Sequence, residues 1–478
     1  MESKINSKAI LITFMIGAFF AILNETLLNI ALTELMEVFG VNAPTVQWLA
    51  TGFMLVMGVL MPISALLIQW FTTRQMFIGV MTVFLIGTTI AASAMNFPML
   101  LTGRMIQAVG TGLLIPVIMN AILLIYKPEV RGKIMGTFGL VIMFAPAIGP
   151  TLSGVIVDTL GWRWLFITVI PFSMFSILFA WKYLQNVGEV TRPGVDVWSI
   201  VLSSVGIAGI VYGFSAAGEA GEGFTSLRIV TIIIVSAVSL VWFVLRQLKL
   251  KEPLLDVRVF KYKSYARGVV LFIIVIMAMF ASEIVMPMYL QGPLGYSAKV
   301  AGLLLLPGAL LNGLMSPVMG SLFDKYGPRK LIIPGTIVLS GVIIFFSNIS
   351  QATPIWFFII VYILLMLSIS AIMMPAQTNA LNELPKNLYP HGTAISNTLQ
   401  PVSGALGVSV FVSIMTQSRE SYLDDRTGTV TQDVMNDAMT FGVHRAYWFA
   451  LALALTAVII SLFIKKAVAA DVDESSGE

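Results

Sequence analysis

The chain has 478 residues, of which 58% are hydrophobic and only 11% are charged, with a formal net charge of +4. A soluble domain carries about 25% charged residues, so this composition excludes a soluble globular protein and predicts an integral membrane protein. The sequence has no cysteine and two histidines far apart, which excludes disulfides and thiolate chemistry and leaves no expected metal site.

Apolar stretches of about 20 residues, long enough to cross a bilayer core of about 30 Å, follow one another along the chain. In order they cover residues 9–33, 45–68, 75–95, 99–126, 134–157, 164–184, 197–217, 228–246, 267–290, 300–322, 331–349, 353–378, 391–416 and 443–464. The first follows the short polar start MESKINSK and is expected to be retained, not cleaved as a signal peptide. These stretches predict an all-α integral membrane protein with 14 transmembrane helices.

The loops between these spans differ in charge. Most of the 28 Lys and Arg residues fall in the loops and tails on the side of the N-terminus. Because cytoplasmic loops are enriched in basic residues, we expect a multi-pass protein of the cell membrane with both termini in the cytoplasm. The basic residues are explained by these inner loops, so they are no argument for nucleic-acid binding.

Two carboxylates lie inside apolar spans at matching places in the two halves of the chain. Glu25 lies in LITFMIGAFFAILNETLLNIAL and Glu283 in VVLFIIVIMAMFASEIVMPMYL. A carboxylate within the bilayer costs roughly 2.5 to 3.5 kcal/mol, so it marks a functional site by default. Burial disfavours its charged form, which would let it change protonation during a transport cycle. The pair predicts an ion-coupled transporter, and the alternative for each is a structural Glu satisfied by polar neighbours.

The order of the spans suggests an internal duplication. Residues 1–184 are predicted to form an N-terminal six-helix bundle and residues 265–466 a C-terminal one. Residues 185–264 then hold linkers and two inserted helices, and residues 467–478 an acidic tail expected to be disordered. Two six-helix halves that face each other around a central site are a recurring transporter architecture.

The loop GSLFDKYGPRK, residues 320–330, resembles the signature of the major facilitator superfamily between the second and third helices of a repeat. The resemblance implies that this loop closes the cytoplasmic side in one state, because an anion is favoured at a helix N-terminus. The implied gating residues are Asp324, Gly327, Arg329 and Lys330. In the first half the loop reads ALLIQWFTTRQ, with Gln69 in the place of the Asp, so a second latch is not expected.

Three further segments resemble the 14-helix drug:proton antiporter branch of that superfamily. LTGRMIQAVGTG contains Arg104, which the resemblance ties to proton coupling and which needs a partner in its apolar helix. APAIGPTLSG resembles the antiporter signature, and its prolines and glycines would let the helix bend and pack at a gating interface. The implied gating residues there are Pro146, Gly149, Pro150 and Gly154, although glycines also serve ordinary helix packing.

In the first span, LNETLLNIAL resembles the family pattern whose acidic residue precedes a Thr by two. That position holds Asn24, and the carboxylate of Glu25 lies one residue later, about 100° around the helix. Coupling through this helix is therefore expected to use a different partner or face. We expect Glu283 to be the principal proton site, with Glu25 and Arg104 also in proton coupling.

The resemblance implies a proton-coupled multidrug efflux antiporter of the lincomycin-resistance exporter type, monomeric and driven by the proton gradient without a cofactor. Its substrates would be hydrophobic or cationic drugs, including lincosamides. An exporter or symporter of a native metabolite is the alternative, and APAIGPTLSG weighs against a symporter. The sequence has no HExxH, GxSxG or phosphate-binding glycine loop, so we expect no enzyme and no catalytic residues.

A substrate cavity is expected to use polar and bulky side chains on helices that line the centre. The candidates, together with Glu283, are Asn24, Asn29, Trp48, Met143, Tyr289, Asn312, Gln377 and Asn397. Trp48 and Tyr289 could equally anchor the membrane interface. The polar outer segment 417–443 is expected to form a hairpin, a short amphipathic helix or a flexible connector.

Overall fold

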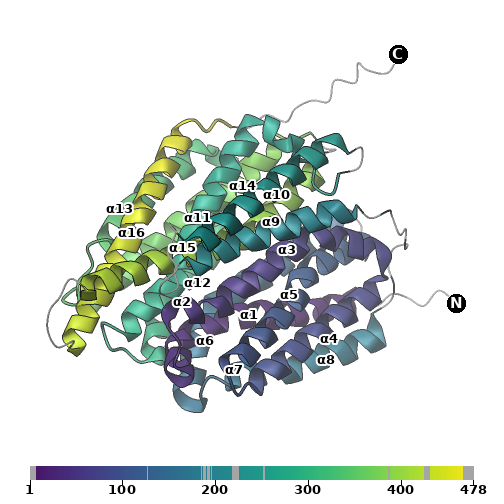
Figure 1. Cartoon of the computed structure of the whole chain (residues 1–478). Helices are drawn as coiled ribbons and strands as arrows, with labels where there is room; N and C mark the ends of the chain where they lie inside the picture. The colour runs from purple at the N-terminus through teal and green to yellow at the C-terminus, as the bar shows by residue number, and fades with distance from the viewer. Residues whose placement is uncertain are drawn as a thin grey trace. The chain divides into compact units, whose positions relative to one another are not determined.

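The computed structural model describes residues 7–125, 128–184, 186, 190, 194, 196–217, 226–250, 253–385, 388–424 and 431–466. Every regular element in that part of the chain is a helix (Figure 1). It contains 13 segments long and apolar enough to cross a membrane. A membrane-embedded backbone must satisfy its own hydrogen bonds, and a helix does so within a single segment. The predicted all-α membrane fold is confirmed.

The predicted spans fall on the helices of the structure, with short helices α2 and α7 opening two of them. In chain order the helices are α1 (Ser7–Phe39), α2 (Ala43–Val46), α3 (Trp48–Trp70), α4 (Thr73–Ala92), α5 (Phe97–Ile125), α6 (Pro128–Leu160), α7 (Trp164–Ile167), α8 (Val169–Tyr183), α9 (Val197–Ala216), α10 (Leu227–Lys249), the 3-10 helix η1 (Val257–Lys261), α11 (Lys263–Gln291), α12 (Ala298–Tyr326), α13 (Arg329–Phe346), α14 (Ile355–Asn382), α15 (Tyr389–Asp424) and α16 (Gln432–Leu462). The predicted span 134–157 lies within α6, several of whose side chains are outside the described part. The acidic tail 467–478 lies outside it as well.

The chain divides into two compact units. Unit 1 comprises residues 1–200 and 286–310, and unit 2 comprises residues 201–285 and 311–478. Within unit 1, α5 packs along α4 and α3, and α1 packs along α6 and α8. Close approach of α4 and α5 depends on glycine: a Cβ on Gly87 would lie 2.5 Å from the backbone nitrogen of Gln107. Small residues at this crossing let the two backbones touch.

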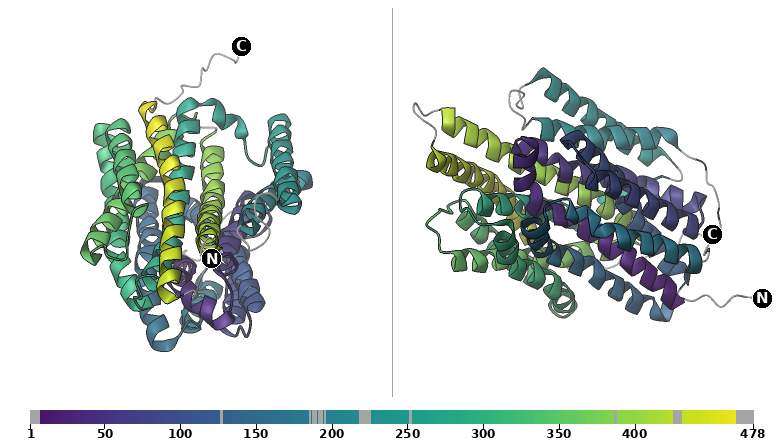
Figure 2. Two further views of the ribbon diagram at one scale, coloured as in Figure 1. Left: turned by 60° about the vertical axis from the view of Figure 1, so that its left-hand side comes forward. Right: turned by 90° about the horizontal axis from the view of Figure 1, so that it is seen from below.

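Unit 2 contains α13 to α16. There α15 packs along α16, and α13 packs against α14 and α16 (Figure 2). Helix α15 continues to Asp424 and α16 begins at Gln432, so most of the polar segment 417–443 extends these two helices. The described parts of the segment, residues 417–424 and 432–443, are helical, and the two helices pack on each other as the arms of the predicted hairpin would.

The inserted helices belong almost entirely to unit 2, and they pack closely on each other and on the rest of that unit. A Cβ on Gly209 of α9 would lie 1.9 Å from Ser236 Oγ of α10, so a larger residue would force Ser236 to shift. The end of α9 is attached to α15, where Gln417 Nε2 donates to the Ala217 carbonyl over 2.8 Å. Leu202 and Phe243 of the inserted pair share a buried cluster with Tyr265 and other residues of α11, α14 and α15.

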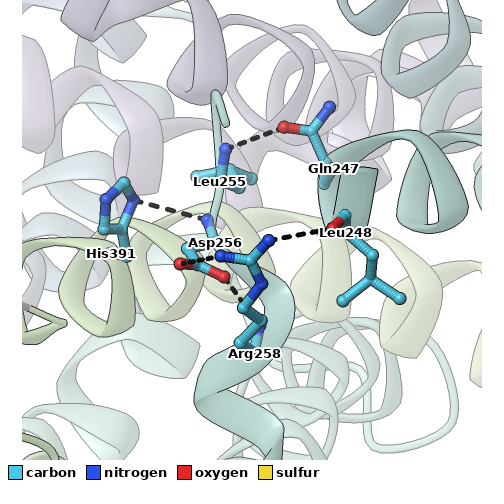
Figure 3. Close-up of polar contacts among 6 residues, drawn as sticks. All are labelled: Gln247, Leu248, Leu255, Asp256, Arg258 and His391. Carbon is cyan, nitrogen blue, oxygen red and sulfur yellow. Dashed lines mark hydrogen bonds and ion pairs between the residues drawn. The ribbon is translucent and has the colours of Figure 1, made fainter. Parts of the chain in front are cut away.

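The linker from α10 to α11 is fixed by a small polar network (Figure 3). Leu255 N donates to Gln247 Oε1 over 3.3 Å, and Asp256 N donates to His391 Nδ1 over 3.3 Å. The carboxylate of Asp256 accepts from the backbone nitrogen of Arg258 over 2.9 Å and lies 3.9 Å from its guanidinium. These contacts hold the linker against the start of α15.

The loop after α12 turns at a glycine. Gly327 has φ of +77°, in the left-handed region that side chains with a Cβ disfavour. Its nitrogen donates to the carbonyl of Phe323 over 2.8 Å, which satisfies one of the orphan carbonyls at the helix end. The tight turn between α12 and α13 therefore requires Gly327.

Candidate functional site

Both carboxylates occupy the same kind of environment in their helices. From Ala21 to Leu32 of α1, every residue except Glu25 is buried, and from Phe280 to Leu290 of α11, every residue except Glu283 is buried. Successive residues step about 100° around a helix, so each run covers all sides of it. Glu25 and Glu283 are therefore the partly exposed residues of helix segments whose other side chains are buried on all sides.

Arg104 of α5 lies near Glu25 but bonds to other groups. Its Nη1 donates to Asn24 Oδ1 over 2.9 Å, to the Asn24 carbonyl over 3.3 Å and to Gln107 Oε1 over 3.1 Å. Its Nε donates to the Leu49 carbonyl of α3 over 3.4 Å. The guanidinium also lies 4.1 Å from the ring centroid of Phe53, a cation–π distance. Arg104 thus joins α1, α3 and α5, and it is only 1% exposed.

The sequence predicts that Arg104 needs a partner, and in the structure its side-chain partners are the neutral amides of Asn24 and Gln107. Glu25 interacts with Arg104 electrostatically, and among the described residues no hydrogen bond or ion pair joins their side chains. The one-residue offset between Asn24 and Glu25 explains this difference, because Asn24 points at the guanidinium and Glu25 is rotated away from it.

A second layer of polar groups supports Arg104. Gln107 Nε2 donates to Thr88 Oγ1 of α4 over 2.8 Å, and Thr88 Oγ1 donates to the Phe84 carbonyl over 2.7 Å. Both side chains are fully buried. We did not expect Gln107 or Thr88 from the sequence. The available signal was a polar residue three positions after Arg104, on the same face of an apolar helix.

Glu283 lies among tyrosines of unit 2. It is close enough to Tyr362 of α14 for an electrostatic interaction. The preceding residue, Ser282, accepts a hydrogen bond over 3.2 Å from the hydroxyl of Tyr447. The ring of Tyr362 stacks on that of Phe358. The ring of Phe346 contacts both Phe358 and Tyr447, so the two tyrosines belong to one aromatic cluster. Sequence reasoning missed both tyrosines, because their helices α14 and α16 come together only in the fold.

The proline and glycine segment of α6 packs tightly within unit 1. A Cβ on Gly149 would lie 2.2 Å from Thr26 Oγ1 on α1, directly beside Glu25. A Cβ on Gly154 would lie 2.4 Å from the Ala298 carbonyl at the start of α12. Pro146 and Pro150 lie inside the same helix. The segment therefore contacts both α1 near the carboxylate and α12.

Two of the predicted gating residues, Arg329 and Lys330, make contacts with described residues. Arg329 Nη2 donates to the Leu462 carbonyl at the end of α16 over 3.4 Å, where a cation is favoured by the helix dipole. Lys330 Nζ lies 5.6 Å from the ring centroid of Tyr326. The side chain of Asp324 is outside the described part of the structure.

The predicted cavity residues have different surroundings. Asn24, Asn29 and Tyr289 are buried, Trp48, Asn312 and Gln377 are partly buried, and Asn397 is exposed. Met143 has its side chain outside the described part. Asn312 Nδ2 lies 3.8 Å from Met366 Sδ on α14. Of these residues, Asn24 and Asn29 lie on the same described helix as Glu25, α1.

Comparisons with known proteins agree with this architecture. The chain matches the Major Facilitator Superfamily over residues 14–408. It is 48% identical to the lincomycin resistance protein LmrB of Bacillus subtilis, covering 96% of this chain and 95% of that protein. It is 47% identical to the protein of the same name from Listeria monocytogenes, covering 97% of this chain and 98% of the relative.

Solved structures share the fold at low sequence identity. A bacterial homologue of the human lysosomal transporter Spinster, in an inward-facing and occupied conformation, has a TM-score of 0.66 at 14% identity, covering 96% of this chain and 97% of that one. A D-xylose–proton symporter has a TM-score of 0.63 at 16% identity, covering 96% and 97%.

The many apolar helices, the family match and the lincomycin-resistance relatives together show a multi-pass membrane transporter, not an enzyme. The chain belongs to the major facilitator superfamily.

Proposed function

We propose that this protein exports hydrophobic or cationic drugs in exchange for protons. The observation that carries the proposal is the pair of carboxylates, Glu25 and Glu283, each of which is the accessible residue of an otherwise buried stretch. A carboxylate in an otherwise buried apolar stretch can bind a proton or a cationic group. The drug class is supported by the relatives named for lincomycin resistance, so lincosamides are the first substrates to test.

Transport would follow an alternating-access cycle. A proton moving down a membrane potential of 100 mV releases about 2.3 kcal/mol, which is enough to concentrate a drug tens-fold when coupling is tight. In this proposal two halves, residues 1–184 and 265–466, rock about a central site. The protein acts as a monomer, needs no cofactor, and has both termini in the cytoplasm.

Proton coupling is tested by drug-dependent proton flux in proteoliposomes under an imposed pH gradient. We expect Glu25→Gln or Glu283→Gln to abolish gradient-driven export of lincomycin, because an amide cannot exchange a proton. Glu37→Gln is the matched control, since Glu37 is an exposed residue on the same helix as Glu25.

The outcomes separate the alternatives. Export that survives both substitutions at the native rate would show that the carboxylates do not couple transport to protons. Gradient-driven uptake instead of export would favour a proton symporter of a native metabolite.

A further inference from the structure

Arg104 is a buried cation that neutral groups hold in place. Every hydrogen-bond acceptor that the described residues offer to it is an amide or a backbone carbonyl, from Asn24, Gln107 and Leu49. Nε and Nη1 make these bonds, while Nη2 donates to none of the described residues. A buried charge without a counter-ion is strongly destabilising. An anion close to Arg104 would therefore stabilise its charged form.

That anion is Glu25. Among the described residues it is the charged group whose field acts on Arg104, and Arg104 is likewise the charged group that acts on Glu25. Glu25 reaches accessible space, whereas Asn24, one residue earlier, is 1% exposed and faces the guanidinium. Two neighbouring side chains therefore have separate roles: Asn24 holds the guanidinium of Arg104, and Glu25 can exchange a proton with solvent.

The orientation of Gln107 follows from the bonds around it. Thr88 Oγ1 gives its proton to the Phe84 carbonyl, so it can only accept from Gln107 Nε2. The other end of the amide, Oε1, must then face Arg104. The chain from Thr88 through Gln107 thus presents a fixed acceptor to the guanidinium.

We propose that Asn24 and Gln107 are positioning residues that hold Arg104 in one place through the whole cycle, so that Glu25 alone exchanges the proton beside a stationary cation. The proposal rests on the proton antiport proposed above. An amide does not titrate, so its bonds to Arg104 persist whether Glu25 is protonated or charged. When Glu25 gains or loses its proton, its electrostatic attraction to Arg104 changes, and the hydrogen bonds of Arg104 stay intact.

The first test moves the carboxylate by one residue. Purified protein is mixed with tetraphenylphosphonium, a hydrophobic cation, and proton release is followed with a pH indicator in weakly buffered detergent solution. We expect Glu25→Gln to release fewer protons than the native protein, leaving those of Glu283, and Asn24→Asp with Glu25→Gln to restore the native amount. Release by the double variant should occur at lower pH than in the native protein, because a carboxylate bonded directly to a guanidinium holds its proton less tightly.

The second test frees the cation. Gln107→Leu removes the fixed acceptor, so Arg104 can turn towards Glu25, and the midpoint of proton release should fall by about one pH unit or more. Asn348→Asp is the control for the carboxylate added in the first test, because Asn348 is exposed just after α13 in unit 2. Its midpoint should match that of the native protein.

The outcomes distinguish this inference from the proposed function. Full proton release by Glu25→Gln would refute Glu25 as a coupling site and with it this inference, whereas antiport through Glu283 would stand. If Glu25→Gln releases fewer protons but a folded double variant fails to restore the native amount, or a folded Gln107→Leu variant keeps the native midpoint, the positioning roles are wrong and antiport through Glu25 stands.

Discussion

At the scale of single residues, the polar groups of unit 1 form a layered arrangement around one cation. Asn24 and Gln107 contact Arg104, and Thr88 supports Gln107 from α4. Hydrogen bonds to a charged group contribute about 1.5 to 3 kcal/mol each in a protein interior. The planar guanidinium spreads its donors over three helices, which a point-like ammonium cannot do.

Arg104→Lys tests this geometry. We expect loss of drug export and a lower temperature of thermal unfolding in detergent, because Lys keeps the charge but cannot reach Asn24, Gln107 and Leu49 together. Arg74→Lys is the matched control, since within the described part of the chain Arg74 donates to one carbonyl, that of Trp181, which an ammonium can also contact. Native export by Arg104→Lys would show that charge alone matters at this position.

At the scale of helices, glycines decide how closely the elements of the site pack. Gly87 brings α4 against α5 at Gln107, and Gly149 brings α6 against α1 at Thr26. Interiors are close-packed, so a single added methyl group at such a crossing must move a backbone or a stiff side chain. The position of Glu25 therefore depends on a residue more than one hundred positions away in the chain.

Gly149→Ala should lower drug export several-fold, because its Cβ would lie 2.2 Å from Thr26 Oγ1 and push α6 away from α1. The double variant with Thr26→Ala should recover export, since it removes the atom in conflict. Gly79→Ala is the control, because a Cβ there meets nothing within 4 Å. The steric explanation fails if Thr26→Ala gives no recovery in a folded protein, as measured by transport into inverted vesicles.

At the scale of the whole molecule, alternating access requires the two ends of the protein to open in turn. The chain has no cysteine, so two cysteines can be introduced at chosen positions and spin-labelled without removing native ones. Suitable exposed positions are Lys182 and Lys466 at the predicted inner ends, and Glu37 and Asn348 at the predicted outer ends.

Distances between labels measured by pulsed electron paramagnetic resonance should change in opposite directions at the two ends when pH is lowered or lincomycin is added. A shorter inner distance with a longer outer distance is the signature of rocking. Distances that change in the same direction at both ends, or that do not change with lower pH or with lincomycin, would contradict the alternating-access cycle proposed for this chain.

The amino-acid sequence by itself determined the class of the protein, the all-helical membrane fold and the places of its helices. These follow from local properties: a span of apolar residues must become a helix in lipid, and a carboxylate within it is costly enough to mark a site. Glu25, Glu283 and Arg104 could be singled out for that reason. The family loop around Gly327 could be recognised from residues that are consecutive in the chain.

Only the tertiary structure decided which side chains meet. It showed that Arg104 bonds to Asn24 and not to Glu25, that Gln107 and Thr88 support it, and that Tyr362 and Tyr447 lie near the Glu283 region. Those contacts join helices distant in sequence, and they depend on crossings set by glycines such as Gly87. The polarity of a residue can be read along the chain, but its partner is set by packing in three dimensions.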